Sequence, residues 1–350
     1  MTMVLPAHHI LPLAHLRRLR LLNGKGRVLV RPGQMVEATD VIAETPAPGQ
    51  HLLLDVRKAL GVQRISEAER LIERQIGERV EKGDILAQTR GLFARILRAP
   101  VAGQVVAIYK GQILLETQPQ PYRLLAGLPG QIAEVFPERG AIVETYGALI
   151  QGVWGNQQNN HGVLTMLAET PDAPLKADML DMTLRGSVIV GGTCYQAEAI
   201  KSAAEIPVRG IILGSLSAPL LPLATSLNVP LILLEGIGQI PINRLAFQLL
   251  NTNQKREVYL QASWNPALSE KPEIVIPLPA EGKEPEEAVE VAPGRMVRVT
   301  LPPYAGAIGK IIRLNSAIVL RSGQRIPAVE VELENSQKVT VPLFNLDIIA

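Results

Sequence analysis

Alternating apolar and polar residues mark both ends of the chain, and continuous apolar runs mark its middle. Near the C-terminus, Val297 and Val299 alternate with Arg298 and Thr300, and a Pro-Pro-Tyr-Ala-Gly turn follows. This pattern predicts a strand, a tight turn and a second strand with one buried face. Gly309 falls inside the second strand, where the absence of a Cβ permits a bulge or a close backbone approach.

Short β segments and a repeated phrase dominate the N-terminal region. The segments 28–44 and 76–88 both contain G-x-x-V-x-x-x-D-(V/I)-(I/L)-A, which predicts an apolar strand, a Gly-led turn and a second strand. The segment 98–116 adds another strand pair punctuated by Pro and Gly. Between the repeats, ISEAERLIERQI predicts an inserted helix at 65–76 with Ser66 as its N-cap.

The middle of the chain changes to a different period. Strands continue through 128–154, and GNQQNNHG at 155–162 predicts a polar loop that cannot bury itself. Four short apolar strands then follow, at 187–192, 208–215, 229–236 and 256–262. Helical stretches separate them, at 195–205, 218–227 and 242–250. Because β and α alternate at this spacing, the pattern predicts right-handed crossovers and a parallel sheet.

These patterns divide the chain into four parts, and the predicted fold class is mixed β and α/β. A β-rich domain occupies 1–126, a parallel α/β domain 127–265, a Pro/Glu-rich linker 266–290 and a small β-barrel 291–350. Within the linker, EIVIPL predicts one short strand, whereas the acidic stretch 281–290 is typical of a segment without fixed structure.

Composition favours a non-membrane protein of the cytoplasm. The chain has 350 residues, 47% of them hydrophobic and 3% aromatic, so it can build two or three aliphatic cores. Its 35 basic and 33 acidic residues nearly cancel, which excludes a polyanion-coating protein. A single cysteine excludes an intramolecular disulfide. The uncharged run between Arg209 and Glu235 is long enough for a membrane helix, which needs roughly 20 residues, but its prolines predict strand, helix and strand instead.

The loops that follow the predicted parallel strands are the candidate ligand site. Ligands bind such sheets at the carboxyl ends of the strands, beside helix N-termini. The residues that could cradle a phosphate or carboxylate there are Gly191, Gly192, Thr193, Ser215, Ser217, Glu235, Gly236 and Gly238. These loops match neither a Walker loop nor the G-x-G-x-x-G fingerprint, and Gly and Ser also end strands and cap helices in most βα loops.

No catalytic set, metal site or cofactor is predicted. Cys194 would lie at a helix N-terminus, yet no base is identifiable near it, so a small buried cysteine is the simpler interpretation. His8, His9 and His15 lie close together but lack a carboxylate at ligand spacing. Enzymatic activity is therefore the less favoured hypothesis.

The C-terminal barrel carries the candidate partner-binding residues. Arg295, Arg298, Lys310 and Arg313 are expected on the face opposite Val297, and Tyr304 at the turn could stack on a base or pack against a protein. Several glutamates share this domain and dilute its positive field, which favours a protein partner while leaving RNA open.

Two resemblances support this division. The pattern G-x-x-V-x-V-x-x-x-P-Y-x-G-x-x-G-x-I, from Gly294 to Ile311, resembles the KOW motif of SH3-like barrels in NusG-type transcription factors and ribosomal proteins. The repeated N-terminal phrase resembles the barrel-sandwich hybrid of biotinyl and lipoyl carriers and of RnfC-type subunits. No lysine lies between Gly83 and Pro100, where a carrier would hold its modified Lys, so the resemblance implies a scaffold.

Three functional hypotheses follow. The first is a non-enzymatic adaptor, resembling a bacterial multidomain protein, that docks on the transcription or translation machinery through the KOW-like barrel. The second is an accessory subunit of a redox or cofactor-dependent complex, implied by the RnfC-like phrase. The third is a small-ligand or phosphate-binding α/β domain. The oligomeric state stays open.

Overall fold

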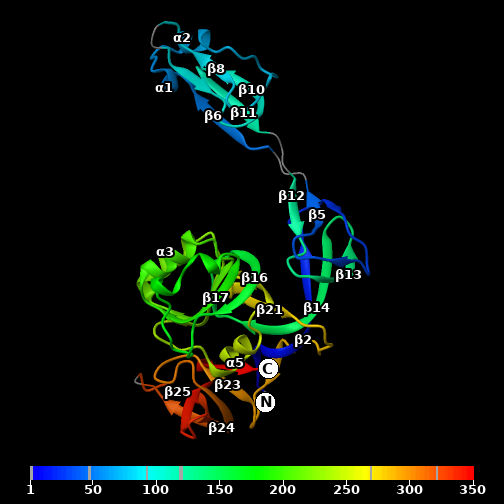
Figure 1. Cartoon of the computed structure of the whole chain (residues 1–350), viewed down its shortest axis with the longest axis vertical. Helices are drawn as coiled ribbons and strands as arrows, with labels where there is room; N and C mark the ends of the chain where they lie inside the picture. The colour runs from blue at the N-terminus through cyan, green and yellow to red at the C-terminus, as the bar shows by residue number, and fades with distance from the viewer. Residues whose placement is uncertain (1–2, 46–48, 92–93, 118–120, 269, 321) are drawn as a thin grey trace.

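The chain folds into a β-rich protein with several sheets. The computed structural model describes residues 3–45, 49–91, 94–117, 121–268, 270–320 and 322–350, with the side chains of 315–316 left out. A large mixed sheet lies at the centre, a second sheet contains the C-terminus, and a separate unit stands at the far end of the molecule (Figure 1). None of the described helices is long and apolar enough to cross a membrane.

The central sheet has the order β15-β19-β18-β17-β16-β20-β21-β14-β13-β4, with β2 paired to β14. The bounds are β15 Trp154–Gly155, β19 Leu231–Ile237, β18 Gly210–Leu216, β17 Ser187–Cys194, β16 Asn159–Met166, β20 Glu257–Gln261, β21 Glu273–Pro277, β14 Gly140–Gln151, β13 Gly130–Phe136, β4 Met35–Val36 and β2 Ile10–Leu21. Strands β17, β18 and β19 are parallel, as the alternating pattern predicted, and β16, which the pattern did not predict, lies parallel to β17. Helices α3 Ala197–Glu205, α4 Leu221–Ser226 and α5 Arg244–Thr252 connect this part of the sheet.

Strand β20 was expected to extend the parallel sheet, and this expectation is wrong. It lies antiparallel to both β16 and β21. The reason is that the chain leaves α5 near the carboxyl end of β16. The Lys255 N–H already bonds to the carbonyl of Leu164, near the carboxyl end of β16, so the next strand runs back toward the beginning of β16.

The segment 266–290 is part of the fold rather than a free linker. Its predicted strand, β21, lies between β20 and β14 in the central sheet. The acidic stretch that follows runs across β1 and β2: the His15 N–H bonds to the carbonyl of Lys283, and the Ala7 N–H bonds to that of Glu287. Strand β22, Ala288–Glu290, then pairs with β1.

The C-terminal sheet has the order β22-β1-β27-β23-β24-β25-β26. The bounds are β1 Val4–His8, β27 Leu346–Ile349, β23 Met296–Val299, β24 Ile308–Val319, β25 Arg325–Leu333 and β26 Lys338–Pro342. The predicted strand, turn and strand are confirmed as β23 and β24. A Cβ at Gly309 would lie 2.6 Å from the Val331 side chain, which confirms the expected close approach. The N-terminal strand β1, which the sequence did not assign to this sheet, pairs with β27.

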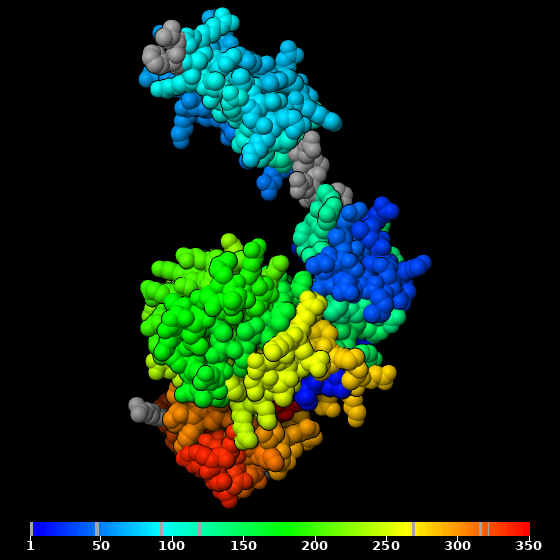
Figure 2. All heavy atoms as spheres, viewed as in Figure 1, coloured from blue at the N-terminus to red at the C-terminus, as the bar shows by residue number. Residues whose placement is uncertain are grey.

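The N-terminal region holds two β units, one inserted into the other. The proximal unit contains β3 Arg27–Val28, β4, β5 Val41–Thr45, β12 Tyr122–Leu125, β13 and the adjoining ends of β2 and β14. The distal unit, residues 51–117, contains β6 His51–Asp55, α1 Val56–Leu60, α2 Ile65–Arg70, β7 Arg79–Val80, β8 Ile85–Gln88, β9 Ile96–Arg98, β10 Gly103–Tyr109 and β11 Gln112–Thr117. In the space-filling view it stands apart from the rest of the described chain (Figure 2).

The two units repeat the same backbone pattern. The Gly33 N–H bonds to the carbonyl of Ile132, and the Gly77 N–H bonds to that of Val105. The neighbouring glutamines match as well: the Gln131 side chain donates to the Gly33 carbonyl, and Gln104 donates to the Gly77 carbonyl. The two units are therefore copies of one internal duplication. The repeated phrase forms the first half of each copy, and the second half is 128–143 in the proximal unit and 101–115 in the distal unit.

Two further sequence predictions need correction. Helix α2 ends at Arg70 rather than at 76, because the Glu73 N–H bonds to the carbonyl of Leu86 and draws the chain toward β8. Its N-cap is Arg64, not Ser66. The predicted polar loop 155–162 is also structured: β16 begins at Asn159, and Asn156 is buried.

Candidate functional site

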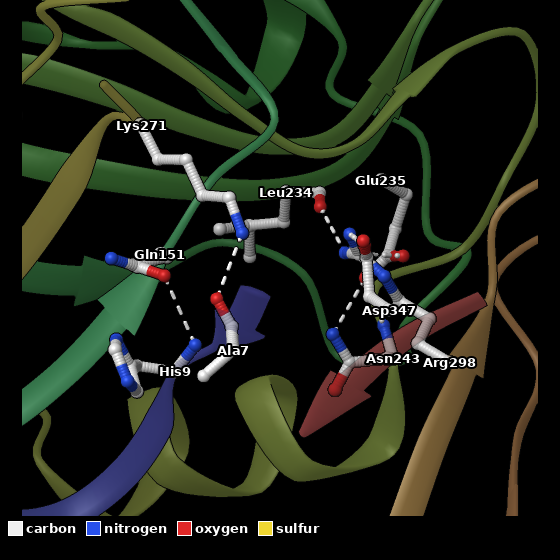
Figure 3. A network of polar contacts seen from close by, with 9 residues as sticks. All are labelled: Ala7, His9, Gln151, Leu234, Glu235, Asn243, Lys271, Arg298 and Asp347. Carbon is white, nitrogen blue, oxygen red and sulfur yellow. Dashed lines mark hydrogen bonds and ion pairs between the residues drawn. The ribbon is translucent and has the colours of Figure 1, made fainter. Parts of the chain in front are cut away.

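A buried polar joint connects the central sheet to the C-terminal sheet. Its centre is Arg298 of β23, whose side chain is 2% exposed. One guanidinium nitrogen donates to the Leu234 carbonyl at 2.7 Å and contacts the Glu235 carboxylate at 3.2 Å. The other donates to Asp347 of β27 (Figure 3). The two carboxylates come from different sheets, so Arg298 ties the sheets together.

The joint continues into helix α5. The second carboxylate oxygen of Glu235 accepts from the Asn243 backbone N–H at 3.0 Å and from its side-chain amide at 2.6 Å. The Asn243 side-chain oxygen in turn caps α5 by accepting from the Ala246 N–H. Because every charged group here has a charged or polar partner, the desolvation of each ion is offset.

Arg298 was expected on a solvent-facing side of its strand, and this expectation is wrong. Val297 and Val299 point into the core of the C-terminal sheet, as the alternation predicted. The opposite face of β23 is covered by the end of β19, so the alternating position is buried too. The other candidate partner residues differ: Arg295, Lys310 and Arg313 are exposed. Tyr304 is half-buried against the same core, and its hydroxyl contacts Gln337.

The exposed face of the C-terminal sheet carries charges in cross-strand pairs. Lys310 lies opposite Glu332, which lies opposite Lys338. Arg313 forms an ion pair with Glu330 at 3.2 Å. Alternating signs across neighbouring strands leave little net field for a polyanion, but they offer directional contacts to a protein surface.

The predicted ligand-binding residues at the carboxyl ends of β17 and β18 are covered by other parts of the chain. A Cβ at Gly191 would meet Leu175 at 2.9 Å, and one at Gly192 would meet the Pro171 carbonyl at 2.6 Å. The Thr193 hydroxyl donates to the Asp172 carbonyl. The Ser215 hydroxyl, fully buried, accepts from the Ile240 N–H at 2.8 Å. Ser217 is half-exposed and does not cap the short helix that follows it.

The remaining predicted residues lie where the C-terminal sheet meets β19. Glu235 is held by Arg298, as described above, and Gly236 and Gly238 both have positive φ. The C-terminal turn reaches this point as well, because a Cβ at Gly306 would meet the Ile240 side chain at 2.6 Å. The edge at which a parallel sheet ordinarily binds ligands is therefore used here for contacts within the chain.

One cavity opens beside this edge. It measures about 430 Å³ and is lined by Leu167, Glu169, Thr170, Ala173, Pro174, Lys176, Asp178 and Met179. None of the predicted ligand-binding residues lines it. Cys194 is buried within the same domain, and burial raises the pKa of its thiol, which disfavours a nucleophilic thiolate. Among the described residues, no cluster of His, Cys, Asp or Glu could hold a metal ion.

Comparison with known proteins adds no identification. The chain matches no protein-family model, and no curated protein is detectably similar to it in sequence. The geometry of the joint and of the exposed surfaces therefore carries the functional argument.

His8, next to the joint, predicts a pH dependence of stability. Its ring is fully buried and has no hydrogen-bond partner among the described residues, and burial, together with Arg298 and Lys271, lowers its pKa well below the ordinary 6.5. Below pH 6.5 the His8 ring binds a proton in the unfolded chain, whereas in the folded chain it stays neutral until the lowered pKa is reached. The free energy of unfolding should therefore fall by about 1.4 kcal/mol per pH unit below 6.5, until the lowered pKa is reached.

The substitution His8→Leu should remove this slope and cost little stability at neutral pH, because no hydrogen bond of the ring is lost. Urea unfolding between neutral pH and pH 5 measures both effects. The matched control is His51→Gln, at an exposed histidine, which should keep the slope. Equal slopes in the wild type and in His8→Leu would contradict the assignment.

Proposed function

We propose that this protein is a non-enzymatic scaffold or adaptor that docks on a large cytoplasmic assembly of the transcription or translation machinery. The observation that carries the proposal is that other parts of the chain cover the edge formed by the carboxyl ends of the parallel strands. Arg298 and the turn at Gly306 close this edge from the C-terminal sheet, and the loop 171–175 closes it from the central sheet. A surface that would serve a ligand in an enzyme instead fixes two parts of the chain to one another.

The proposed domain identities agree with this function. The C-terminal sheet, with its KOW-like turn, is proposed to be an SH3-like barrel that binds the partner. The proximal and distal units are proposed to be two barrel-sandwich hybrids, and they repeat the same pattern of hydrogen bonds. Neither the proximal nor the distal unit is proposed to carry a modified lysine, so both units are assigned a structural or docking role.

The partner-binding surface is proposed to be the exposed face that includes Arg295, Lys310 and Arg313. Since the charges of this face alternate in sign, a protein surface of complementary pattern is the expected partner. Electrostatic complementarity of this kind specifies the partner and its orientation more than it adds affinity.

A charge-reversal experiment tests this proposal without disturbing the joint. The triple variant Arg295→Glu, Lys310→Glu and Arg313→Glu should still fold, because all three side chains are exposed, although repulsion from Glu330 and Glu332 should lower the free energy of unfolding by about 1–2 kcal/mol. Affinity purification followed by quantitative mass spectrometry should recover ribosomal or RNA polymerase subunits with the wild type. The variant should lose most of this recovery.

The matched control places the same charge change on the distal unit, at the exposed Lys58, Arg70 and Lys82. This control should keep the partners. If the control loses them and the C-terminal triple variant keeps them, the surface is assigned wrongly. Recovery of redox or metabolic subunits in place of ribosomal or polymerase subunits would favour an accessory subunit of an enzyme complex. Loss of recovery on RNase treatment would identify RNA as the bridge.

A further inference from the structure

One edge strand of the distal unit, β6, lacks the features that normally prevent further strand pairing. In the sheet order β6-β11-β10-β7, it pairs only with β11 among the described residues (Figure 1). Proteins protect such edges with short strands, charged residues or proline. The opposite edge strand, β7, has two residues, whereas β6 has five, with the sequence His-Leu-Leu-Leu-Asp. The outer side of β6 is therefore open to a further strand.

The proximal unit contains the equivalent strand in a protected form. Counted from the first pair of each β-hairpin, Leu114 of β11 and Ile142 of β14 occupy the same place. Leu53 of β6 pairs with the first of these residues, and Leu19 of β2 pairs with the second. Leu53 and Leu19 are both exposed, by 62% and 56%. Arginines flank Leu19 on both sides, whereas leucines flank Leu53, so the distal edge alone lacks this positive charge.

The backbone groups of β6 alternate between β11 and the free edge. At one end of the strand, the Val56 N–H bonds to the Gly111 carbonyl. Just before its other end, the Thr117 N–H bonds to the Gln50 carbonyl. Because antiparallel hydrogen bonds recur at every second residue, the even-numbered residues bond to β11 and the odd-numbered residues direct their groups outward. The outward groups are the N–H and carbonyl of His51 and Leu53 and the N–H of Asp55.

Helix α1, which follows β6, leaves this edge open. Val56 and Leu60 of the helix are buried in the core of the distal unit, so the helix lies on the core-facing side of the sheet. The helix also packs toward the β10–β11 turn, because a Cβ at Gly111 would lie 3.2 Å from the Cγ of Arg57. Both contacts direct α1 away from the outer side of β6.

We propose that β6 pairs with β6 of a second copy of this chain, antiparallel and about a twofold axis that passes through Leu53. In this register the two Leu53 residues lie opposite each other, and His51 of each copy lies opposite Asp55 of the other. The outward backbone groups then meet and exchange hydrogen bonds. The leucines form an apolar contact, and the imidazole donates to the carboxylate. Because the strand matches itself in backbone, apolar contact and charge, a second copy is favoured over an unrelated strand.

The polar groups at the ends of β6 retain capacity for this contact. One carboxylate oxygen of Asp55 caps α1 by accepting from the Lys58 N–H at 3.1 Å. The other oxygen lies 3.8 Å from an Arg57 nitrogen, and the His51 Nε2 lies 3.8 Å from a Glu116 oxygen. Both distances of 3.8 Å exceed that of a hydrogen bond. The second Asp55 oxygen and the imidazole are therefore available to the other copy.

Sedimentation velocity of the full-length protein, from roughly 1 to 500 µM, tests the proposal. The wild type should dimerise with a Kd on the order of 10–100 µM, because a pair of five-residue strands buries less than a standard interface. Leu53→Lys should weaken the dimer at least about tenfold, since it places two like charges opposite each other. The matched control Leu19→Lys changes the equivalent exposed residue of the proximal unit and should leave the Kd unchanged.

The substitution Leu53→Cys tests the register without adding a charge. Residues directly opposite in a hydrogen-bonded antiparallel pair have Cα atoms about 5.5 Å apart, which a disulfide can span. With glutathione disulfide as oxidant, this variant should form a covalent dimer. His51→Cys should not, because its two cysteines would lie four residues apart along the strands, or about 13 Å. The native Cys194 is buried, so the wild type serves as the blank.

The proposal is overturned if the wild type stays monomeric over this concentration range. A dimer that Leu53→Lys leaves intact, or that Leu19→Lys weakens equally, would also overturn it, as would equal cross-linking of Leu53→Cys and His51→Cys. A monomeric wild type that loses a co-purified protein on Leu53→Lys substitution would assign the edge to a strand of another protein instead. The proposed partner surface is tested separately, because its residues lie in the C-terminal sheet.

Discussion

Replacement of Arg298 by methionine is expected to lower the free energy of unfolding by about 3–5 kcal/mol, because it leaves a buried carboxylate without a counter-charge. The side chain of Glu235 is 1% exposed and would retain only Asn243 as a partner among the described residues. Methionine preserves much of the apolar stem of arginine, so the loss reports the ion pair rather than the packing. Urea unfolding at neutral pH measures it.

Two variants complete this experiment. Arg313→Met removes an ion pair at an exposed position of the same sheet and should cost less than about 1 kcal/mol. Glu235→Gln combined with Arg298→Met should recover part of the loss, since the amide needs no counter-charge. If Arg298→Met costs no more than Arg313→Met, the joint does not hold the two sheets together.

Replacement of Asn156 by alanine is the second substitution with a large expected effect. Its side-chain amide donates to the Ala224 and Val229 carbonyls, and its oxygen accepts from the Leu231 N–H at 3.0 Å. These contacts fix the connection between α4 and β19. Alanine would leave several buried backbone groups unpaired, and we expect a loss of about 2–4 kcal/mol in the free energy of unfolding.

The control for Asn156 is Asn251→Ala, at an exposed position of helix α5, which should change stability by less than about 0.5 kcal/mol. Asn156→Asp distinguishes the two roles of the amide, because a carboxylate can still accept from Leu231 but cannot donate to the carbonyls. It should be at least as destabilising as alanine. A near-neutral Asn156→Ala in thermal or urea unfolding would show that water satisfies these groups equally well.

Local patterns in the sequence predicted the elements of the fold well. The apolar runs at 187–192, 208–215 and 229–236 became β17, β18 and β19, and the uncharged run from Arg209 formed strand, helix and strand. Gly309 lies against β25 as expected of a glycine within a strand. These features depend on residues close together in the chain, because hydrophobic periodicity and turn-forming residues determine the local secondary structure.

Pairings between distant segments could not be predicted in the same way. Strand β1 joins the C-terminal sheet although more than 300 residues separate it from β27. Nothing in the alternation of its residues specifies that partner. The repeated phrase that contains Gly33 and Gly77 indicates only the first half of the internal duplication. The shared Gly-Gln at 103–104 and 130–131 is the feature that could have revealed it.

The polar joint shows why a local pattern cannot assign a site. In a strand with one solvated face, a residue that alternates with Val297 and Val299 is exposed. Arg298 occupies such a position, and its burial follows only from the packing of β19 against the other face of β23. For an equally local reason, the position of Glu235 at the end of a parallel strand predicts a ligand-binding residue. Its actual partner lies 63 residues away, in a different sheet.

The central claim is that the C-terminal sheet and the parallel strands form one body, joined through Arg298. Native-state amide hydrogen exchange measures this directly. The account predicts that the amides of β23 and β27 open with the same free energy as those of β19, and that Arg298→Met separates the two groups. Much faster exchange of β23 and β27 than of β19 in the wild-type protein would contradict it, because the C-terminal sheet would then be an independently opening module.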